Sequence, residues 1–150
     1  MSPEARERIR EQLKIDEGVV YEIYLDHLEL PTLGIGHLIL EGDYEHGKDV
    51  GTPVSVERVN ALFDVDLNIA LKECEVLYGA GWFYLPEEVQ EILVNMLFNV
   101  GRPRLTKFVK MNKAIEASDW KTAAVEGRDS LWFRQVGARA ERLMSRLESV

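Results

Sequence analysis

The sequence predicts an α+β protein that is mostly helical, with one small antiparallel sheet near its start. Apolar residues recur at helical spacing in several long segments, whereas residues 19–40 change to a pattern typical of strands and turns. The chain has 150 residues, of which 46% are hydrophobic. That is enough to bury a core without metals or disulfides, in one domain or in two small lobes.

A first helix is expected over residues 2–16, ending at Glu17. Ser2 is a suitable capping residue, and Pro3 suits the first helical position. Gly18 directly after Glu17 is a typical end signal. One apolar stripe runs along this segment, formed by Ala5, Ile9 and Leu13.

Strands are expected next, on both sides of a turn. Val19, Val20, Ile23 and Tyr24 precede the turn, and apolar residues follow it up to Leu38. A polar loop with three glycines then runs over residues 41–53.

A long helix is expected over residues 56–78, with Ser55 as its capping residue. A helix of this length in so short a chain can join two lobes. Its apolar side includes Cys74, and a buried, inert thiol is expected there. Because Cys74 is the only cysteine, no internal disulfide is possible. Gly79 and Gly81 should end the helix.

The second half of the chain is expected to be helical throughout. Pro86 opens a helix that is apolar around most of its circumference, which predicts a buried helix ending at Gly101. Shorter helices are expected from about Thr106 to Glu116, from Ser118 to Glu126, around Leu131 to Arg134, and from Gly137 to the end.

Charge and hydropathy exclude several functions. The net charge of −8 argues against nucleic acid, which requires a basic face. No apolar run is long enough for membrane insertion. The N-terminal residues are charged rather than apolar, so we expect no signal peptide and synthesis in a cytoplasm.

Two carboxylates nine residues apart, Glu17 and Asp26, are the most informative feature. Thr32 and the turn Gly34-Ile35-Gly36-His37 follow them. An acid at a helix C-terminus is electrostatically unfavourable, and aspartate is a poor strand former, so both positions suggest a function. Glycoside hydrolysis requires such a pair across a cleft. The structural alternatives are a surface glutamate, an aspartate that accepts turn hydrogen bonds, and an ordinary strand threonine.

These segments resemble the N-terminal signature of the phage T4-type lysozymes, the endolysins of glycoside hydrolase family 24. In that family the order is Glu, Asp nine residues later, and Thr six residues after that. The likeness continues to near the C-terminus, although this chain stops somewhat short of the family's usual end. The residues that carry this likeness are 15–18, 24–26, 31–37, 94–101, Phe108, 120–125, 132–135 and 139–142.

The resemblance implies a lysozyme-like fold. A small hairpin lobe over about 15–55 would be joined by the helix 56–78 to a helical lobe over about 79–150, on which the helix 2–16 packs. It also implies that Glu17 is the general acid, and that Asp26 and Thr32 position and activate water in an inverting reaction. The implied substrate is the β-1,4 bond from N-acetylmuramic acid to N-acetylglucosamine in peptidoglycan. No cofactor and no metal are expected.

Further site residues follow from the resemblance. Those expected to contact substrate are Leu38, Phe98, Asn99 and Gln135. His37 is expected to pair with Asp66 in a structural rather than catalytic role, which would raise its pKa. Arg139 is expected to hold Glu17, and Arg142 meets Asp16 or is simply solvated. Trp132 is expected in the core, and Glu126 stands where the family more often has a neutral polar residue.

The implied setting is a phage or prophage endolysin, a bacteriolytic, antimicrobial hydrolase used in host cell lysis. We expect a monomer made in the bacterial host cytoplasm, released by a separate membrane-permeabilising protein, that acts on the cell wall. The alternatives are a glycosidase of other specificity, such as for chitin, and a non-catalytic wall-binding relative.

The charge of −8 is unexpected for a protein that acts on an anionic wall. We expect long-range repulsion, and therefore activity that rises with added salt. The alternative is a local basic patch in the second lobe, made of Arg102, Arg104, Lys107, Lys110, Lys113, Arg134 and Arg139.

Overall fold

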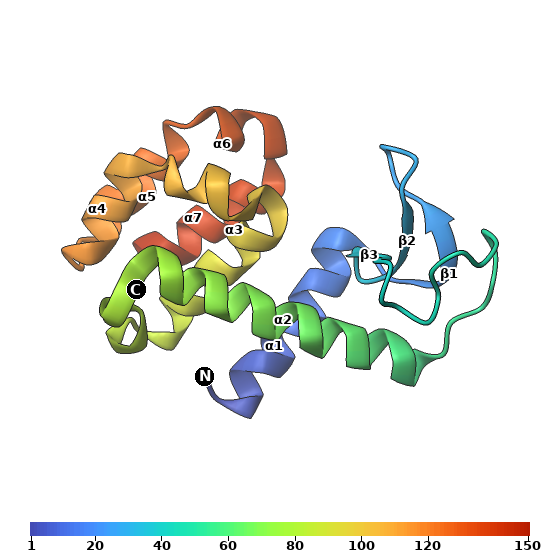
Figure 1. The fold of residues 1–150 in the computed structure, drawn as a ribbon. Helices are drawn as coiled ribbons and strands as arrows, with labels where there is room; N and C mark the ends of the chain where they lie inside the picture. The colour runs from blue at the N-terminus through green and yellow to red at the C-terminus, as the bar shows by residue number, and fades with distance from the viewer. The chain divides into compact units, whose positions relative to one another are not determined.

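The computed structural model describes residues 1–150 and confirms the α+β prediction (Figure 1). It contains seven α-helices, one 3-10 helix and a three-stranded sheet. The chain divides into two compact units: Arg6–Ile69, here the sheet unit, and Met1–Ala5 with Ala70–Val150, here the helical unit. The predicted lobe boundaries and the packing of helix 2–16 on the second lobe stay predictions.

The sheet unit begins within α1 (Pro3–Glu17), whose bounds confirm the predicted helix. The hydroxyl oxygen of Ser2 accepts a hydrogen bond from the Ala5 amide at 3.1 Å, as expected of a capping serine. Gly18 has φ of +78°, a conformation that glycine adopts without strain, and the helix ends there.

The sheet is antiparallel with the order β1-β2-β3. Its strands are β1 (Val20–Leu25), β2 (Pro31–Gly34) and β3 (His37–Leu38). Thr32 on β2 lies opposite Tyr24 on β1 and opposite Leu38 on β3. Three apolar side chains of this part of the unit are buried: Ile23, Leu33 and Ile35.

The helix α2 (Val56–Tyr78) has the predicted bounds. Ser55 caps it, because its hydroxyl accepts a hydrogen bond from the Arg58 amide at 3.1 Å. Within the sheet unit, Arg10 of α1 pairs with Asp64 of α2 at 2.7 Å.

The helical unit continues α2 with an element that the sequence did not predict, the 3-10 helix η1 (Gly79–Tyr84). The two glycines end α2 as expected, but the chain keeps turning instead of extending. Tyr78 and Trp82 stack with their ring centroids 6.0 Å apart, and both are buried. This aromatic contact stabilises the tight turn.

The helix α3 (Glu87–Thr106) corrects the prediction that Gly101 ends the helix. Gly101 does break the regular geometry, with φ of +78° and ψ of 160°, but a further helical turn begins at once. Pro103 lies in that new turn, where its missing N–H costs nothing. The stretch Val89–Leu97 is buried, as predicted for this helix.

Four shorter helices complete the unit: α4 (Val109–Glu116), α5 (Trp120–Arg128), α6 (Leu131–Val136) and α7 (Ala138–Glu148). Two starts differ from the prediction. The helix α4 begins at Val109 rather than at about Thr106, because Thr106 is the last residue of α3 and Phe108 is the residue that precedes α4. The helix α5 begins at Trp120 rather than at Ser118, and Asp119 caps it by accepting a hydrogen bond from the Thr122 amide at 3.2 Å.

The prediction of a buried thiol is confirmed, since Cys74 is fully buried in α2. Desolvation by burial, with a smaller contribution from Glu73, raises the pKa of this thiol to about 12. Trp132 lies in the core, also as predicted. None of the helices combines the length and apolar character needed to cross a membrane.

Candidate active site

Glu17 is the last residue of α1 and is half-buried. The turn between β2 and β3 passes beside it at Gly36. A Cβ atom built on Gly36 would lie 3.8 Å from both Cβ and Oε2 of Glu17. The Gly-x-Gly turn therefore brings backbone close to the proposed acid, as a glycine allows.

Asp26 follows β1 and holds the turn that leads to β2. Its Oδ1 accepts hydrogen bonds from the amides of Leu28 at 2.8 Å and Leu30 at 2.9 Å. The structural alternative for Asp26, an aspartate that accepts turn hydrogen bonds, is therefore present in the fold. It does not exclude a chemical role, because Oδ2 makes no hydrogen bond within the protein.

Thr32 is 4% exposed, and its hydroxyl donates to the Leu30 carbonyl at 2.8 Å. The same carbonyl accepts from the Asp26 amide at 3.0 Å. The peptide groups of Leu30 thus hold Asp26 and Thr32 together. Since the hydroxyl proton of Thr32 is committed to Leu30, its oxygen can act only as an acceptor toward a water molecule.

The phenol of Tyr24 is influenced by both carboxylates of the site. Its pKa is raised, first by desolvation and then by the negative charges of Asp26 and Glu17. Both carboxylates therefore lie close enough to influence one phenol. The sequence analysis gave Tyr24 as a strand residue and as part of the family resemblance, but not as a site residue; the structure places it opposite Thr32.

His37 lies between two carboxylates. Its Nδ1 is 2.7 Å from Asp66 Oδ2, and its Nε2 is 2.8 Å from Asp43 Oδ2. The expected hydrogen bond to Asp66 is thus present, and Asp43 is a second partner that the sequence analysis missed. Burial alone would lower the pKa of His37, but the hydrogen bonds and charges of both aspartates outweigh it and raise the pKa. The supporting role of His37 and Asp66 in a site stays a prediction.

The other candidate in the sheet unit is Leu38. Its side chain is 43% exposed on β3, opposite Thr32. An exposed leucine beside this threonine is placed to contact a ligand at the site, although contact with substrate stays a prediction.

Four candidates lie in the helical unit. Phe98 is half-buried on α3, and Gln135 is exposed on α6. Asn99 Oδ1 accepts a hydrogen bond from Trp132 Nε1 at 2.7 Å. Arg139 Nε donates to Asn95 Oδ1 at 2.8 Å. The implied substrate contacts and the implied contact of Arg139 with Glu17 stay predictions.

Comparison with known proteins identifies the family of this chain. The family model described as phage lysozyme matches residues 14–149. The chain belongs to the phage lysozyme family. Its function is therefore lysozyme-like, and the matched region contains both carboxylates and Thr32.

The similar proteins include two from Dictyostelium discoideum. Probable T4-type lysozyme 2 is 31% identical over 159 aligned residues, which cover 94% of each chain. Probable T4-type lysozyme 1 is 30% identical over 159 residues, also with 94% of each covered.

The third similar protein is much longer than this chain. The pre-baseplate central spike protein Gp5 of Enterobacteria phage T4 is 33% identical over 150 residues. The match covers 89% of this chain but only 26% of the spike protein.

Proposed function

We propose that this protein cleaves the β-1,4 bond between N-acetylmuramic acid and N-acetylglucosamine in peptidoglycan, with inversion at the anomeric carbon. Glu17 protonates the glycosidic oxygen as the bond from that oxygen to the anomeric carbon breaks. Water attacks the carbon from the opposite face, and Asp26 takes the proton that the water loses. Both carboxyl groups then return to their starting states by exchange with solvent.

The observation that carries this proposal is the shared support of Asp26 and Thr32 by Leu30. Oδ1 of Asp26 is occupied by the turn, which fixes the carboxylate, whereas Oδ2 remains available to accept a proton. Thr32 Oγ1 can accept a second hydrogen bond from the same water, since its proton is donated to Leu30. A water held by two acceptors directs its lone pair away from them, toward the sugar.

The test of the acid is Glu17→Gln. This substitution keeps the shape of the side chain and removes the transferable proton, so the rate should fall by about 10²–10⁴. Loss of turbidity of outer-membrane-permeabilised cells measures the rate, and a thermal melt checks that the variant is folded. A folded variant that lyses cells at the wild-type rate would remove Glu17 from the mechanism.

The test of the stereochemistry is the configuration of the first product. NMR of early digests should show a new reducing end with the α configuration, because an inverting site leaves room for water between Asp26 and the sugar. A β product would require Asp26 to act as a nucleophile.

Assays on the wild-type protein also test the two alternatives, a glycosidase of other specificity and a non-catalytic wall-binding relative. Release of reducing ends from chitin at a rate equal to that from peptidoglycan would favour a broader glycosidase. Wall binding without any release of reducing ends would favour a non-catalytic relative.

A further inference from the structure

The net charge of the protein is unevenly divided between its two units. The sheet unit, Arg6–Ile69, has six Lys and Arg residues against fourteen Asp and Glu residues. The helical unit has twelve of each, so the whole charge of −8 belongs to the sheet unit and the helical unit is neutral. Repulsion from an anionic polymer is therefore a property of the unit that carries Glu17 and Asp26.

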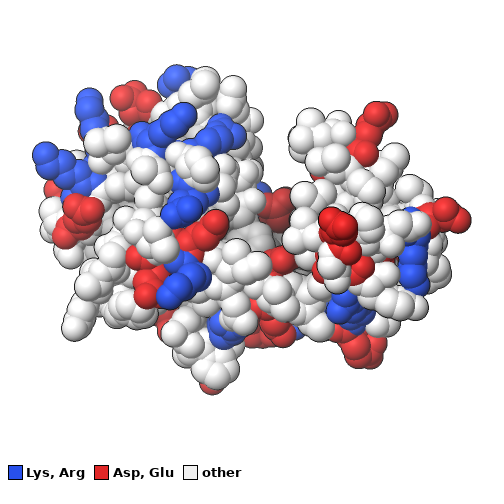
Figure 2. Space-filling model, viewed as in Figure 1, with Lys and Arg blue, Asp and Glu red and all other residues white.

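Within the neutral helical unit the positive charges are concentrated. No acidic residue occurs between Glu91 and Glu116, and that interval contains five cations. They form what is here called the cationic strip: Arg102, Arg104, Lys107, Lys110 and Lys113. In the space-filling view, Lys and Arg side chains gather over this unit, whereas Asp and Glu predominate over the sheet unit (Figure 2).

The cationic strip is not neutralised by neighbouring side chains. None of its five members forms a salt bridge or a side-chain hydrogen bond within the protein, and all except Arg102 are exposed. Other cations of the same unit are paired: Arg146 with Glu88 at 2.6 Å, and Arg128 with Glu141 and Glu148. The free charges of the strip are available to a partner.

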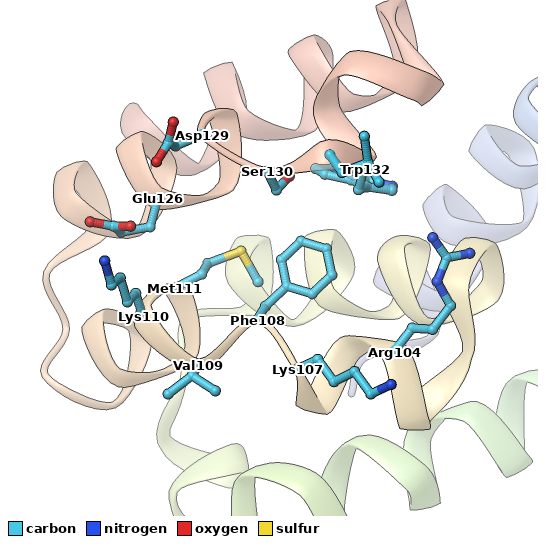
Figure 3. A pocket seen from close by; sticks show the side chains of 11 residues that line it. Arg104, Lys107, Phe108, Val109, Lys110, Met111, Glu126, Asp129, Ser130 and Trp132 are labelled. Carbon is cyan, nitrogen blue, oxygen red and sulfur yellow. The ribbon is translucent and has the colours of Figure 1, made fainter.

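The strip borders a hollow in the helical unit with a volume of about 520 Å³ (Figure 3). Arg104, Lys107 and Lys110 line it, together with the rings of Phe108 and Trp132. These two rings meet edge to face, with centroids 5.9 Å apart. Pockets that take small molecules or chain segments usually fall between about 300 and 1,000 Å³.

Glu126 and Asp129 also line this hollow, from α5. The three cations outnumber these two acids, and the rest of the strip adds two further positive charges. A ligand in the hollow therefore meets positive potential at the strip, although the molecule as a whole is acidic. Charge location, rather than net charge, decides which polymers such a surface attracts.

We propose that the cationic strip and the hollow beside it form an anion-binding surface that holds the protein on the anionic polymer of the cell wall. The ligand groups are carboxylates or phosphates repeated along that polymer. The choice of the wall rests on the proposed function, whereas the binding itself is separate from catalysis. The helical unit then provides attraction that the acidic sheet unit cannot.

The test measures binding without turnover, in a Glu17→Gln background. The variant Lys107→Gln/Lys110→Gln/Lys113→Gln is compared with a control, Lys14→Gln/Lys48→Gln/Lys72→Gln, which loses the same charge outside the strip. Both are sedimented with purified wall sacculi at rising salt. The strip variant should lose at least about tenfold in affinity at low salt and show a weaker salt dependence, whereas the control should change less than about twofold.

Two further arms identify the anion. Retained binding to sacculi stripped of phosphate-containing polymers assigns carboxylates as the ligand, whereas lost binding assigns phosphate. Equal affinity of the strip variant and the control would overturn the proposal, as would binding that strengthens with salt. Double-stranded DNA bound as tightly as sacculi would overturn the assignment to the wall. Because no hydrolysis is measured, failure of the catalytic proposal leaves these results unaffected.

Discussion

Gly36 lies beside Glu17: a Cβ atom built on the glycine would be in van der Waals contact, 3.8 Å from Oε2 of the glutamate. The turn of the Gly34-Ile35-Gly36-His37 motif thus forms part of the wall around the proposed acid. Both glycines have positive φ, +59° at Gly34 and +64° at Gly36, where a side chain is strained.

The two glycines should nevertheless differ in their tolerance of alanine. At Gly34 the added Cβ would lie 2.9 Å from Val59 Cγ1 in the sheet unit, whereas at Gly36 nothing is closer than 3.8 Å. Gly36→Ala should cost about 1 kcal/mol of unfolding free energy from strain alone. Gly34→Ala should cost about 2–5 kcal/mol, because overpacking is added. Urea denaturation measures both, and equal losses would contradict the role given to Val59.

Asp26 should show two separable roles. Asp26→Asn keeps a side-chain oxygen for the amides of Leu28 and Leu30, so its stability should stay near that of the wild type while activity falls steeply. Asp26→Ala removes both hydrogen bonds and should lose a further ~1–3 kcal/mol of unfolding free energy. Thermal melts and lysis assays on the two variants separate the roles. An active Asp26→Asn would exclude the proposed base, and an Asp26→Ala as stable as Asp26→Asn would exclude the turn role.

Local signals predicted most helix ends correctly. Capping serines and a terminal glycine are decided by neighbouring residues, so the bounds of α1 and α2 could be found from the sequence. Gly101 was also correctly identified as a break. The restart after it was missed because Pro103 is usually taken as a sign that a helix has ended, whereas here it occupies a first turn.

Contacts between distant segments were harder to predict. The pairing of His37 with Asp66 followed only from the family resemblance, and Asp43 was not predicted at all. Asp43 lies in the polar loop after β3, where composition indicates a loop but not its path. The division of charge into an acidic sheet unit and a neutral helical unit was likewise not predicted, because a net charge of −8 does not reveal how the fold groups the residues.

Cys74 should be unreactive in the folded protein. The thiolate is the reactive form of cysteine, and the pKa of this buried thiol is raised to about 12. Ellman's reagent should therefore label it only at the rate of unfolding, and stoichiometrically in denaturant. Fast labelling without denaturant would show that the α2 segment around Cys74 opens locally. Cys74→Ala provides the blank.

The imidazole between Asp66 and Asp43 should make stability depend on pH. The pKa of His37 is raised in the folded protein. The contribution of His37 to stability is therefore complete below its unfolded pKa of about 6.5, and it is lost as pH rises through its folded pKa. Burial alone would raise the pKa of Asp43, but hydrogen bonds from the Leu40 amide and from His37 outweigh burial and lower the pKa of this carboxyl group. The contribution of Asp43 to stability is therefore complete above its unfolded pKa of about 3.9, and it is lost as pH falls through its folded pKa.

Both contributions are therefore present together near pH 5. His37→Asn should cost about 3–5 kcal/mol there, because it leaves two half-buried carboxylates without their cation. The cost should shrink as pH rises above the raised pKa of His37, since the wild-type imidazole is then neutral as well. Chemical denaturation at several pH values measures the difference. His46→Asn, at an exposed loop histidine, is the control and should show no such profile. A cost of His37→Asn that is the same at pH 5 and pH 9 would mean that the imidazole acts only by packing and hydrogen bonding, not by its charge.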